Sequence, residues 1–269
     1  MKVTLIQQDT RFADPDYNFT HISALIEEAV KAESPDVIVL PETFNTGFFP
    51  RENLASFADD DGKRTRETIG ALAKKHGVNV VAGSVANRRA DGVYNTALVF
   101  DREGNEIASY DKTHLFTPSG EDDFFVKGDH LTSFTLDGAK CGLIICYDIR
   151  FPELTRTLAL GGMDVLFVVA QWPEPRIAHL LALSKARAIE NQAFVVCCNS
   201  CGKAGGTQNG GHSSVHDPWG ALLAVAGAGE EILSAACDLT VLSGIRESIN
   251  VFRDRRPALY RLGAAPEDI

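Results

Sequence analysis

The sequence of 269 residues contains no long apolar run. Its longest apolar stretches are about the length of one buried strand, whereas a membrane-spanning helix needs about 20 apolar residues. The apolar stretch near the N-terminus is also far too short to be the core of a signal peptide. From these absences we expect a cytoplasmic protein that does not bind membranes.

An excess of positive charge is absent as well. The formal net charge is −10 at pH 7, from 26 Lys and Arg against 36 Asp and Glu. An acidic chain repels phosphate backbones and anionic lipid headgroups. No block of like charge is longer than the triple aspartate at residues 59–61, so we see no charged tail. We therefore expect no nucleic-acid partner.

The cysteine pattern does not indicate the disulfide framework of a small secreted protein. Four of the six lie within apolar runs, and a chain of this length buries a large core without covalent cross-links. Free thiols in a reducing compartment are the better interpretation. The cysteines are Cys141, Cys146, Cys197, Cys198, Cys201 and Cys237.

One spacing nearly fits a zinc site. Cys198 and Cys201 are followed by His212 and His216, in the order of a Cys₂His₂ finger. The ten residues between Cys201 and His212 are fewer than the usual dozen or so. A turn signal, Asp217-Pro218, directly follows where a ligand-bearing helix would be needed. We therefore expect no metal site here.

Short apolar runs alternate with amphipathic segments along the whole chain. The runs predict strands at residues 2–7, 37–40, 78–82, 97–100, 141–145, 165–169 and 193–197. Helical periodicity predicts helices at residues 16–32, 64–76, 152–160 and 176–191. This alternation indicates an α/β architecture with helices covering largely apolar sheets. Without repeats or a long linker, we expect a single domain over residues 1–269.

Two local patterns are more specific. In the helix predicted at residues 176–191, Leu180, Leu183, Ala186 and Ile189 form an apolar stripe, with Arg187 on another face. Residues 202–211 contain five glycines and few apolar residues, which predicts a surface loop that could border a pocket. The loop lacks the Gly-Lys-Ser/Thr ending of a P-loop, so a phosphate cradle is rejected.

Glu42 follows the predicted strand at residues 37–40 almost directly. A carboxylate at this position lies at the edge of a sheet, where α/β proteins bind ligands. An isolated glutamate would more often be a solvated loop residue. Phe44, Phe48 and Phe49 lie close by in the sequence and indicate partly dry surroundings instead. Desolvation raises a carboxyl pKa towards neutrality, as a general base requires.

Lys112 and Cys146 also follow strand-like runs. A lysine is usually a surface residue, and Lys112 alone would carry no functional interpretation. Cys146 ends the run at residues 141–145, and Pro152 suits the first turn of a helix after it. A turn from strand to helix exposes its first side chain and leaves backbone N–H groups unpaired, as in a nucleophile elbow. A buried structural cysteine is the commoner alternative.

Taken together, these residues resemble the nitrilase (carbon–nitrogen hydrolase) superfamily. The resemblance rests on Glu42 in Leu-Pro-Glu-Thr-Phe, Lys112 in Tyr-Asp-Lys-Thr-His-Leu-Phe and Cys146 in Cys-Tyr-Asp-Ile-Arg-Phe-Pro-Glu-Leu. The helical segment 185–192, Lys-Ala-Arg-Ala-Ile-Glu-Asn-Gln, is a further match. Three motifs in the right order are far more specific than one short pattern, and the likeness extends over residues 1–252.

The resemblance implies an α-β-β-α sandwich, with two mixed sheets face to face and helices outside. It implies a Glu42–Lys112–Cys146 triad that works without metal or organic cofactor, and Glu121 is the match for a second glutamate. In the mechanism that we expect, Lys112 and the backbone N–H of Tyr147 hold the oxyanion. A homodimer that pairs through its helices and a C-terminal arm at residues 253–269 is also implied.

The substrate is expected to be a small amide. The run 171–176, Gln-Trp-Pro-Glu-Pro-Arg, looks like the omega-amidase branch, whose members cleave the terminal amide of 2-oxo acids such as 2-oxoglutaramate. Nitrilases usually show Cys-Trp-Glu, whereas this chain has Cys-Tyr-Asp at residues 146–148, which argues against a nitrile. Candidate substrate contacts are Phe48, Phe116, Trp172 and Arg176. Arg150 is another possible carboxylate partner, or it pairs with Glu153.

Two alternatives stay open from the sequence. One is a hydrolase of N-carbamoyl amines or amino acids, which would use the same triad and release carbon dioxide as well as ammonia. The other is a catalytically silent relative that acts as a binding or assembly module. The intact triad argues against the silent module, because binding alone would not require those three residues.

Overall fold

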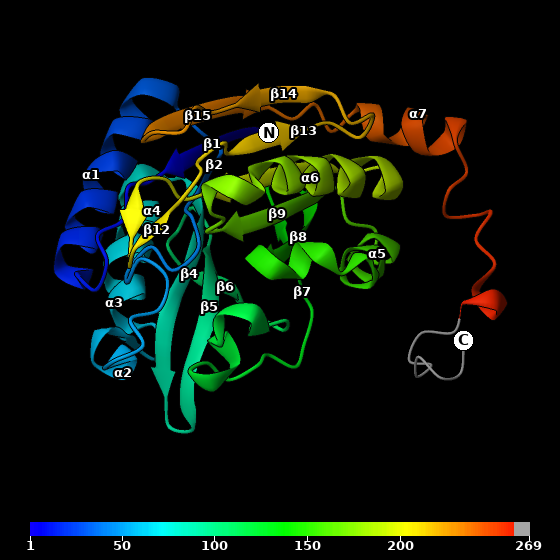
Figure 1. Cartoon of the computed structure of the whole chain (residues 1–269). Coiled ribbons are helices and arrows are strands. Elements are labelled where there is room, and N and C mark those ends of the chain that lie inside the picture. The colour runs from blue at the N-terminus through cyan, green and yellow to red at the C-terminus, as the bar shows by residue number, and fades with distance from the viewer. Residues whose placement is uncertain (261–269) are drawn as a thin grey trace.

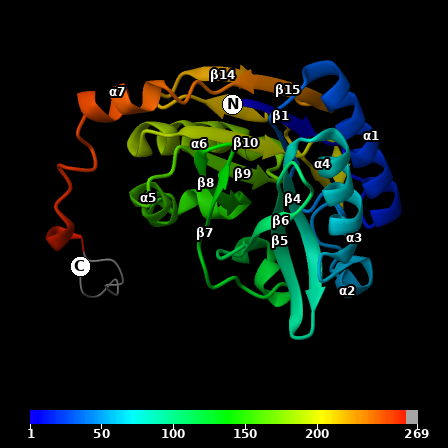
Figure 2. The ribbon, with the colours of Figure 1, turned by 180° about the vertical axis from the view of Figure 1, so that it is seen from behind.

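The computed structural model describes residues 1–260, in which two large mixed sheets lie face to face (Figures 1 and 2). In the first sheet β1, β2 and β4 are parallel, whereas β15, β5 and β6 run antiparallel to their neighbours. Its strands, in spatial order, are β15 (Glu231–Ala236), β1 (Lys2–Gln7), β2 (Val37–Val39), β4 (Asn79–Arg89), β5 (Gly92–Phe100) and β6 (Glu106–Asp111), with β3 (Asp59–Asp60) beside β4.

The second sheet has the same mixed character. Its central strands β8, β9 and β10 are parallel, and β7, β13 and β14 pair antiparallel at the edges. In spatial order they are β14 (Leu222–Val225), β13 (Ser214–His216), β10 (Phe194–Asn199), β9 (Val165–Ala170), β8 (Ala139–Ile145) and β7 (Thr132–Leu136). A separate hairpin joins β11 (Lys203–Ala204) to β12 (Thr207–Gln208).

Helices cover the outer face of each sheet, which confirms the expected α-β-β-α sandwich. Figures 1 and 2 show α1, α3 and α4 outside the first sheet and α5 and α6 outside the second. The α-helices are α1 (Pro15–Glu33), α2 (Leu54–Phe57), α3 (Lys63–Thr65), α4 (Ala71–His76), α5 (Pro152–Leu160), α6 (Ile177–Asn191) and α7 (Val241–Ser248). A π-helical turn at Arg66–Gly70 joins α3 to α4, so the helix predicted at residues 64–76 forms as one segment.

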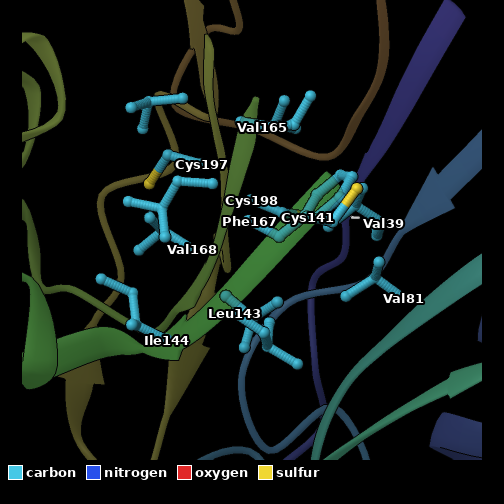
Figure 3. Close-up of a cluster of buried hydrophobic side chains, with 14 of the residues drawn as sticks. Val39, Val81, Cys141, Leu143, Ile144, Val165, Phe167, Val168, Cys197 and Cys198 are labelled. Carbon is cyan, nitrogen blue, oxygen red and sulfur yellow. Dashed lines mark hydrogen bonds between the residues drawn. The ribbon is translucent and has the colours of Figure 1, made fainter. Parts of the chain in front are cut away.

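The central strands are apolar along their whole length because both of their faces are buried. Side chains alternate across a strand, and Figure 3 shows the result in the second sheet. Leu143 and Phe167 point towards Val39 and Val81 of the first sheet, whereas Ile144 lies on the opposite, helix-covered side. The second sheet therefore packs one apolar face against the first sheet and the other against the helices.

The structure corrects the predicted burial of α6. Ile189, assigned to the apolar stripe, is 45% exposed, whereas Arg187 is only 5% exposed. The Arg187 guanidinium donates two hydrogen bonds to the Ile149 carbonyl oxygen, at 3.0 and 2.8 Å, and one to Glu190. The helix is thus rotated so that it anchors the segment after Cys146, because satisfying a buried guanidinium outweighs burying one more isoleucine.

Several polar strands escaped the sequence prediction. The apolar runs at residues 78–82 and 97–100 are only the inner parts of β4 and β5, which continue as a long hairpin.

Of the arm expected at residues 253–269, residues 253–260 are described and the rest lie outside the described part. No helix within residues 1–260 combines the length and apolarity that crossing a bilayer requires.

Candidate active site

The segment that carries Glu42 is fixed between the two sheets. It leaves β2 and is held by a bulge in β4, where Ser84 bonds to Thr43 and Phe44. The backbone N–H of Glu42 reaches the Ala170 carbonyl of the opposite sheet, at 3.3 Å. Gly83 makes this approach possible, since a Cβ there would lie 2.0 Å from the Pro41 carbonyl oxygen. The expected dry surroundings of Glu42 are confirmed, because its side chain is fully buried.

Lys112 continues β6 and is also fully buried. Its Nζ lies 2.9 Å from Oε1 of Glu42 and 2.9 Å from both carboxylate oxygens of Glu121. Burial by itself lowers the pKa of Lys112, but the charges of Glu121 and Glu42 outweigh it and hold the pKa well above its ordinary value. Lys112 therefore stays a cation, and two carboxylates flank it.

Glu121 is the residue that the resemblance suggested as a second glutamate. It begins a short 3-10 helix, Glu121–Asp123, and its Oε2 accepts the backbone N–H of Phe116 at 2.6 Å. Burial raises the pKa of Glu121 above its ordinary value, while Lys112 opposes the rise. Asn95 donates to both carboxylates, at 2.9 Å to Glu42 and 3.3 Å to Glu121. The sequence analysis missed Asn95, which sits mid-strand in β5 and has no local signal.

Cys146 occupies the turn that its position predicted. It ends β8 and starts the 3-10 helix Cys146–Arg150, with a left-handed φ of 51° that is strained for a side chain with a Cβ. Burial raises the pKa of the Cys146 thiol well above its ordinary value, and the charge of Glu42 raises it further, whereas Lys112 lowers it. At neutral pH the group is therefore a thiol, which needs a base to become a nucleophile.

Glu42 has an oxygen suited to that task. Its Oε1 is occupied by Lys112 and Asn95, but its Oε2 is buried and has no hydrogen-bond partner among residues 1–260. An acceptor oxygen left unpaired away from water is costly, and a transferred proton would satisfy it. The geometry thus separates the two oxygens of Glu42 into one that binds Lys112 and one that can take a proton.

Asp148 ties the Lys112 segment to the Cys146 segment. Fully buried, it accepts hydrogen bonds from Tyr110, Thr113, His114 and the backbone of Ile145, at 2.8 to 3.1 Å. The sequence analysis noted this aspartate only as a departure from the Cys-Trp-Glu signature. Its role could not be seen there, because its partners Tyr110 and His114 lie 38 and 34 residues away in the sequence.

Removing this link should misplace the nucleophile. For Asp148→Ala we expect kcat/KM for an amide substrate to fall about 100-fold, because an error of 1 Å in catalytic geometry costs about that much. Steady-state kinetics check it. The control is the exposed Asp129→Asn variant, which removes a carboxylate whose one side-chain partner among residues 1–260 is its neighbour His130. An Asp148→Ala enzyme as active as the control would show that the link does not position Cys146.

A cavity of about 120 Å³ opens beside Cys146. The predicted contacts Phe48, Phe116, Trp172 and Arg176 all line it. Tyr147 lines it too, and in the first turn of a 3-10 helix its N–H has no acceptor within that helix. Residues 202–211 border the cavity through Ala204, Thr207 and Asn209, as expected of this loop.

Two arginines line the wall of this cavity. The guanidinium of Arg176 stacks on Phe116 at 4.7 Å, and that of Arg150 stacks on Trp172 at 4.6 Å. The suggested pairing of Arg150 with Glu153 is wrong, since the polar neighbour of Arg150 is His179. Within residues 1–260 these are the only charged side chains that line the cavity. The wall is therefore suited to an anionic group.

The zinc-like spacing has a different explanation in the structure. The thiol of Cys198 faces the backbone carbonyls of Ile6 and Val39, and that of Cys201 faces Gln7. Across the described residues, no three His, Cys, Asp or Glu side chains are placed to share a metal ion. Both cysteines pack between strands of the two sheets.

Comparisons with known proteins agree with this geometry. The sequence model of the carbon–nitrogen hydrolase family matches residues 2–247. The 2-oxoglutaramate amidase of Bacillus subtilis is 43% identical, over 96% of this chain and 98% of that protein. A CN-hydrolase superfamily protein of Xanthomonas campestris, with an arsenic adduct in its active site, has a TM-score of 0.90 at 30% identity, over 98% of this chain and 99% of that chain.

A third likeness bears on the cysteine. The amidase of Nesterenkonia sp. AN1 has a TM-score of 0.86 at 26% identity, over 98% of this chain and 97% of that chain. In a glutamate-to-glutamine mutant of that amidase, the active-site cysteine carries the acetamide moiety of fluoroacetamide.

Proposed function

The chain belongs to the carbon–nitrogen hydrolase family, and on that premise we propose that it hydrolyses the terminal amide of a small 2-oxo acid, such as 2-oxoglutaramate. The observation that carries the proposal is the surroundings of Cys146. Cys146 lines a small cavity with two arginines on its wall, and it interacts electrostatically with the buried pair of Glu42 and Lys112. The name of the Bacillus subtilis relative supports the choice of substrate.

In the first step, the sulfur of Cys146 attacks the amide carbon while its proton moves to Oε2 of Glu42. A new C–S bond forms, and the carbonyl π electrons move onto oxygen. The resulting oxyanion is held by Nζ of Lys112 and the backbone N–H of Tyr147. The raised pKa of the Cys146 thiol fits this order of events, because the proton leaves only as the sulfur attacks.

In the second step, the C–N bond breaks and Glu42 returns the proton to the departing nitrogen, so that ammonia leaves and a thioester remains on Cys146. Water then attacks the thioester, with Glu42 taking its proton and returning one to the sulfur. Glu121 keeps Lys112 charged and oriented throughout, through its two contacts of 2.9 Å. In the Nesterenkonia amidase mutant the cysteine forms a covalent adduct, which supports Cys146 as the nucleophile here.

The substrate's far end would be bound by the arginines. A 2-oxo acid amide carries a carboxylate, and guanidinium groups are the preferred partners of carboxylates. Arg150 and Arg176 are each held against an aromatic ring, so little side-chain freedom is lost when they bind an anion. The aromatic side chains of Phe48, Phe116 and Trp172 would enclose the short carbon chain.

The two alternatives are less well supported. An N-carbamoyl substrate would also present a carboxylate or amine, but the relatives with named activities described above are amidases. A silent binding module does not account for a buried lysine between two carboxylates and a base oxygen without a partner. Burying these charges carries a desolvation cost, and a catalytic role accounts for it whereas simple binding does not.

An ammonia-release screen tests the proposal. With reduced wild-type protein we expect kcat/KM of about 10⁴ M⁻¹s⁻¹ or more on 2-oxoglutaramate, less on 2-oxosuccinamate, and little on glutamine or simple nitriles. Cys146→Ala is the matched control and should release no ammonia above background. Carbon dioxide released from an N-carbamoyl compound would favour that alternative, and ammonia from none of the compounds would favour the binding module.

We further propose a cytoplasmic homodimer built from a single domain, with residues 253–269 as a C-terminal arm. Six buried cysteines without disulfides support a reducing compartment. The exposed apolar side chains Leu160, Ile189 and Trp219 lie on or beside α5 and α6, and a second copy would cover them. Sedimentation equilibrium distinguishes the dimer from a monomer.

A further inference from the structure

Three residues that line the cavity each carry a buried N–H donor that has no partner among residues 1–260. The donors are the side-chain amides of Gln171 and Asn209 and the indole of Trp172. These residues are only 6%, 2% and 3% exposed, so water does not freely solvate them. A buried donor without an acceptor costs about 1–3 kcal/mol, and three such donors around one cavity point to a ligand that supplies the acceptors.

The orientation of Gln171 is fixed by a chain of hydrogen bonds. The backbone N–H of Phe48 donates to the Thr43 hydroxyl at 2.9 Å, so the Thr43 proton is directed to Oε1 of Gln171 at 2.7 Å. With its oxygen thus occupied, Gln171 leaves its Nε2 as the group that can bind a ligand. The indole nitrogen of Trp172 can only donate. At least two of the three groups therefore require an acceptor.

The charges around the cavity favour the same kind of ligand as these donors do. The charged side chains that line it, within the described residues, are Arg150 and Arg176, and no carboxylate lines it. A ligand rich in acceptor oxygens and carrying negative charge matches both features. A ligand with an ammonium group would place more donors and a positive charge against this wall.

With the amide hydrolysis proposed above as its premise, we infer that Gln171, Trp172 and Asn209 are specificity-determining residues. Their N–H groups bind the 2-oxo and carboxylate oxygens of the substrate and exclude the 2-amino analogue. A 2-oxo group accepts hydrogen bonds, whereas the ammonium of glutamine, on the same carbon chain, only donates them. A site whose buried polar groups are left unpaired by an analogue can reject it by several orders of magnitude.

The test compares matched substrates in wild-type and variant enzymes. We expect wild-type kcat/KM for 2-oxoglutaramate to exceed that for glutamine by about 10³-fold or more. Asn209→Leu removes one donor at nearly constant volume, whereas Trp172→Phe removes one donor together with part of the ring. Each should lower kcat/KM for 2-oxoglutaramate about 10- to 100-fold. Butyramide has neither oxo nor carboxylate oxygens, so in the same variants its kcat/KM should fall clearly less than that of 2-oxoglutaramate, and the ratio of the two values is the readout.

Asn209→Asp adds a sharper comparison, because it replaces a donor with a charged acceptor. The preference for 2-oxoglutaramate over glutamine should then shrink by more than in Asn209→Leu. If wild-type enzyme cleaves 2-oxoglutaramate but the variants keep its ratio to butyramide, the inference is wrong while the proposed function stands. If wild-type enzyme cleaves butyramide but no 2-oxo acid amide, the proposed function itself fails.

Discussion

Replacing Glu42 with glutamine should lower kcat by about 10³-fold or more while making the thiol of Cys146 more acidic. General-base catalysis by a positioned carboxylate contributes about 10²- to 10⁴-fold, and here the same group also protonates the leaving ammonia. Glutamine keeps the shape and the carbonyl oxygen that Lys112 and Asn95 contact. It cannot take a proton, so the loss is chemical rather than structural.

The second half of this prediction follows from the direction of the pKa shift. Burial raises the pKa of Cys146, and the negative charge of Glu42 adds to the rise, while Lys112 lowers it. Removing the charge of Glu42 leaves Lys112 opposed only by burial, so the pKa must fall. The pH at which iodoacetamide alkylates Cys146 at half its maximal rate should therefore move down in Glu42→Gln, although turnover is lost.

Mass spectrometry of alkylated protein over a pH series measures this midpoint. The other five cysteines are buried, so Cys146→Ala supplies the background. If Cys146 of the wild-type enzyme instead rests as a thiolate, the wild-type midpoint should already lie well below neutral pH, and no base would be needed. An unchanged or raised midpoint in Glu42→Gln would show that Glu42 carries no negative charge beside the thiol, which contradicts its assignment as the base.

The sequence predicted those parts of the site that lie next to strong local signals. Glu42 and Cys146 each follow a continuous apolar run that both sheets bury, and such runs mark the ends of β2 and β8. Lys112 has a weaker signal, and the likeness to a known family identified it. The alternation of apolar runs and amphipathic segments predicted an α/β architecture, whereas the sandwich of two sheets was implied by the likeness to a known family.

The rest of the site depends on contacts between distant segments. Asn95 lies in the interior of β5, and only the pairing of β5 with β6 brings it to the carboxylates around Lys112. The buried face of α6 differs from its apolar stripe because Arg187 finds a carbonyl partner in another element. Periodicity counts apolar residues and cannot see a polar partner that satisfies a buried cation.

Lys112 variants should lose stability as well as activity, whereas Cys146→Ala should lose activity alone. Nζ of Lys112 balances two buried carboxylates, Glu42 and Glu121, at 2.9 Å each. Removing one partner of a buried ion pair costs about 3–5 kcal/mol, because the remaining charge is left without compensation. Removing the sulfur of Cys146 leaves no charge unpaired, and we expect a change within about 1 kcal/mol.

A pair of substitutions separates the charge from the packing. Lys112→Ala removes both the ammonium and the buried side-chain stem, whereas Lys112→Met keeps most of the stem. Both should be inactive, because the oxyanion loses its cation. If uncompensated carboxylates cause the instability, Lys112→Met should regain only part of the unfolding free energy lost in Lys112→Ala. That part corresponds to the void left by the missing side-chain stem. Urea unfolding measures the free energy of each variant, and equal stability of Lys112→Met and Cys146→Ala would show that the buried charges matter little.

The loss of unfolding free energy in Lys112→Met should depend on pH, and the pKa of Glu121 sets the direction of this dependence. Burial raises the pKa of Glu121 above its ordinary value of 4.5, and Lys112 opposes the rise. Without Lys112 the folded-state pKa rises further above the unfolded value. A carboxyl of this kind stabilises the fold below its unfolded pKa and loses that contribution as pH rises through the folded pKa. The deficit of Lys112→Met relative to wild type should therefore widen between about pH 5 and about pH 8. If the deficit in unfolding free energy narrowed over this range, Lys112 would not be stabilising the two buried carboxylates.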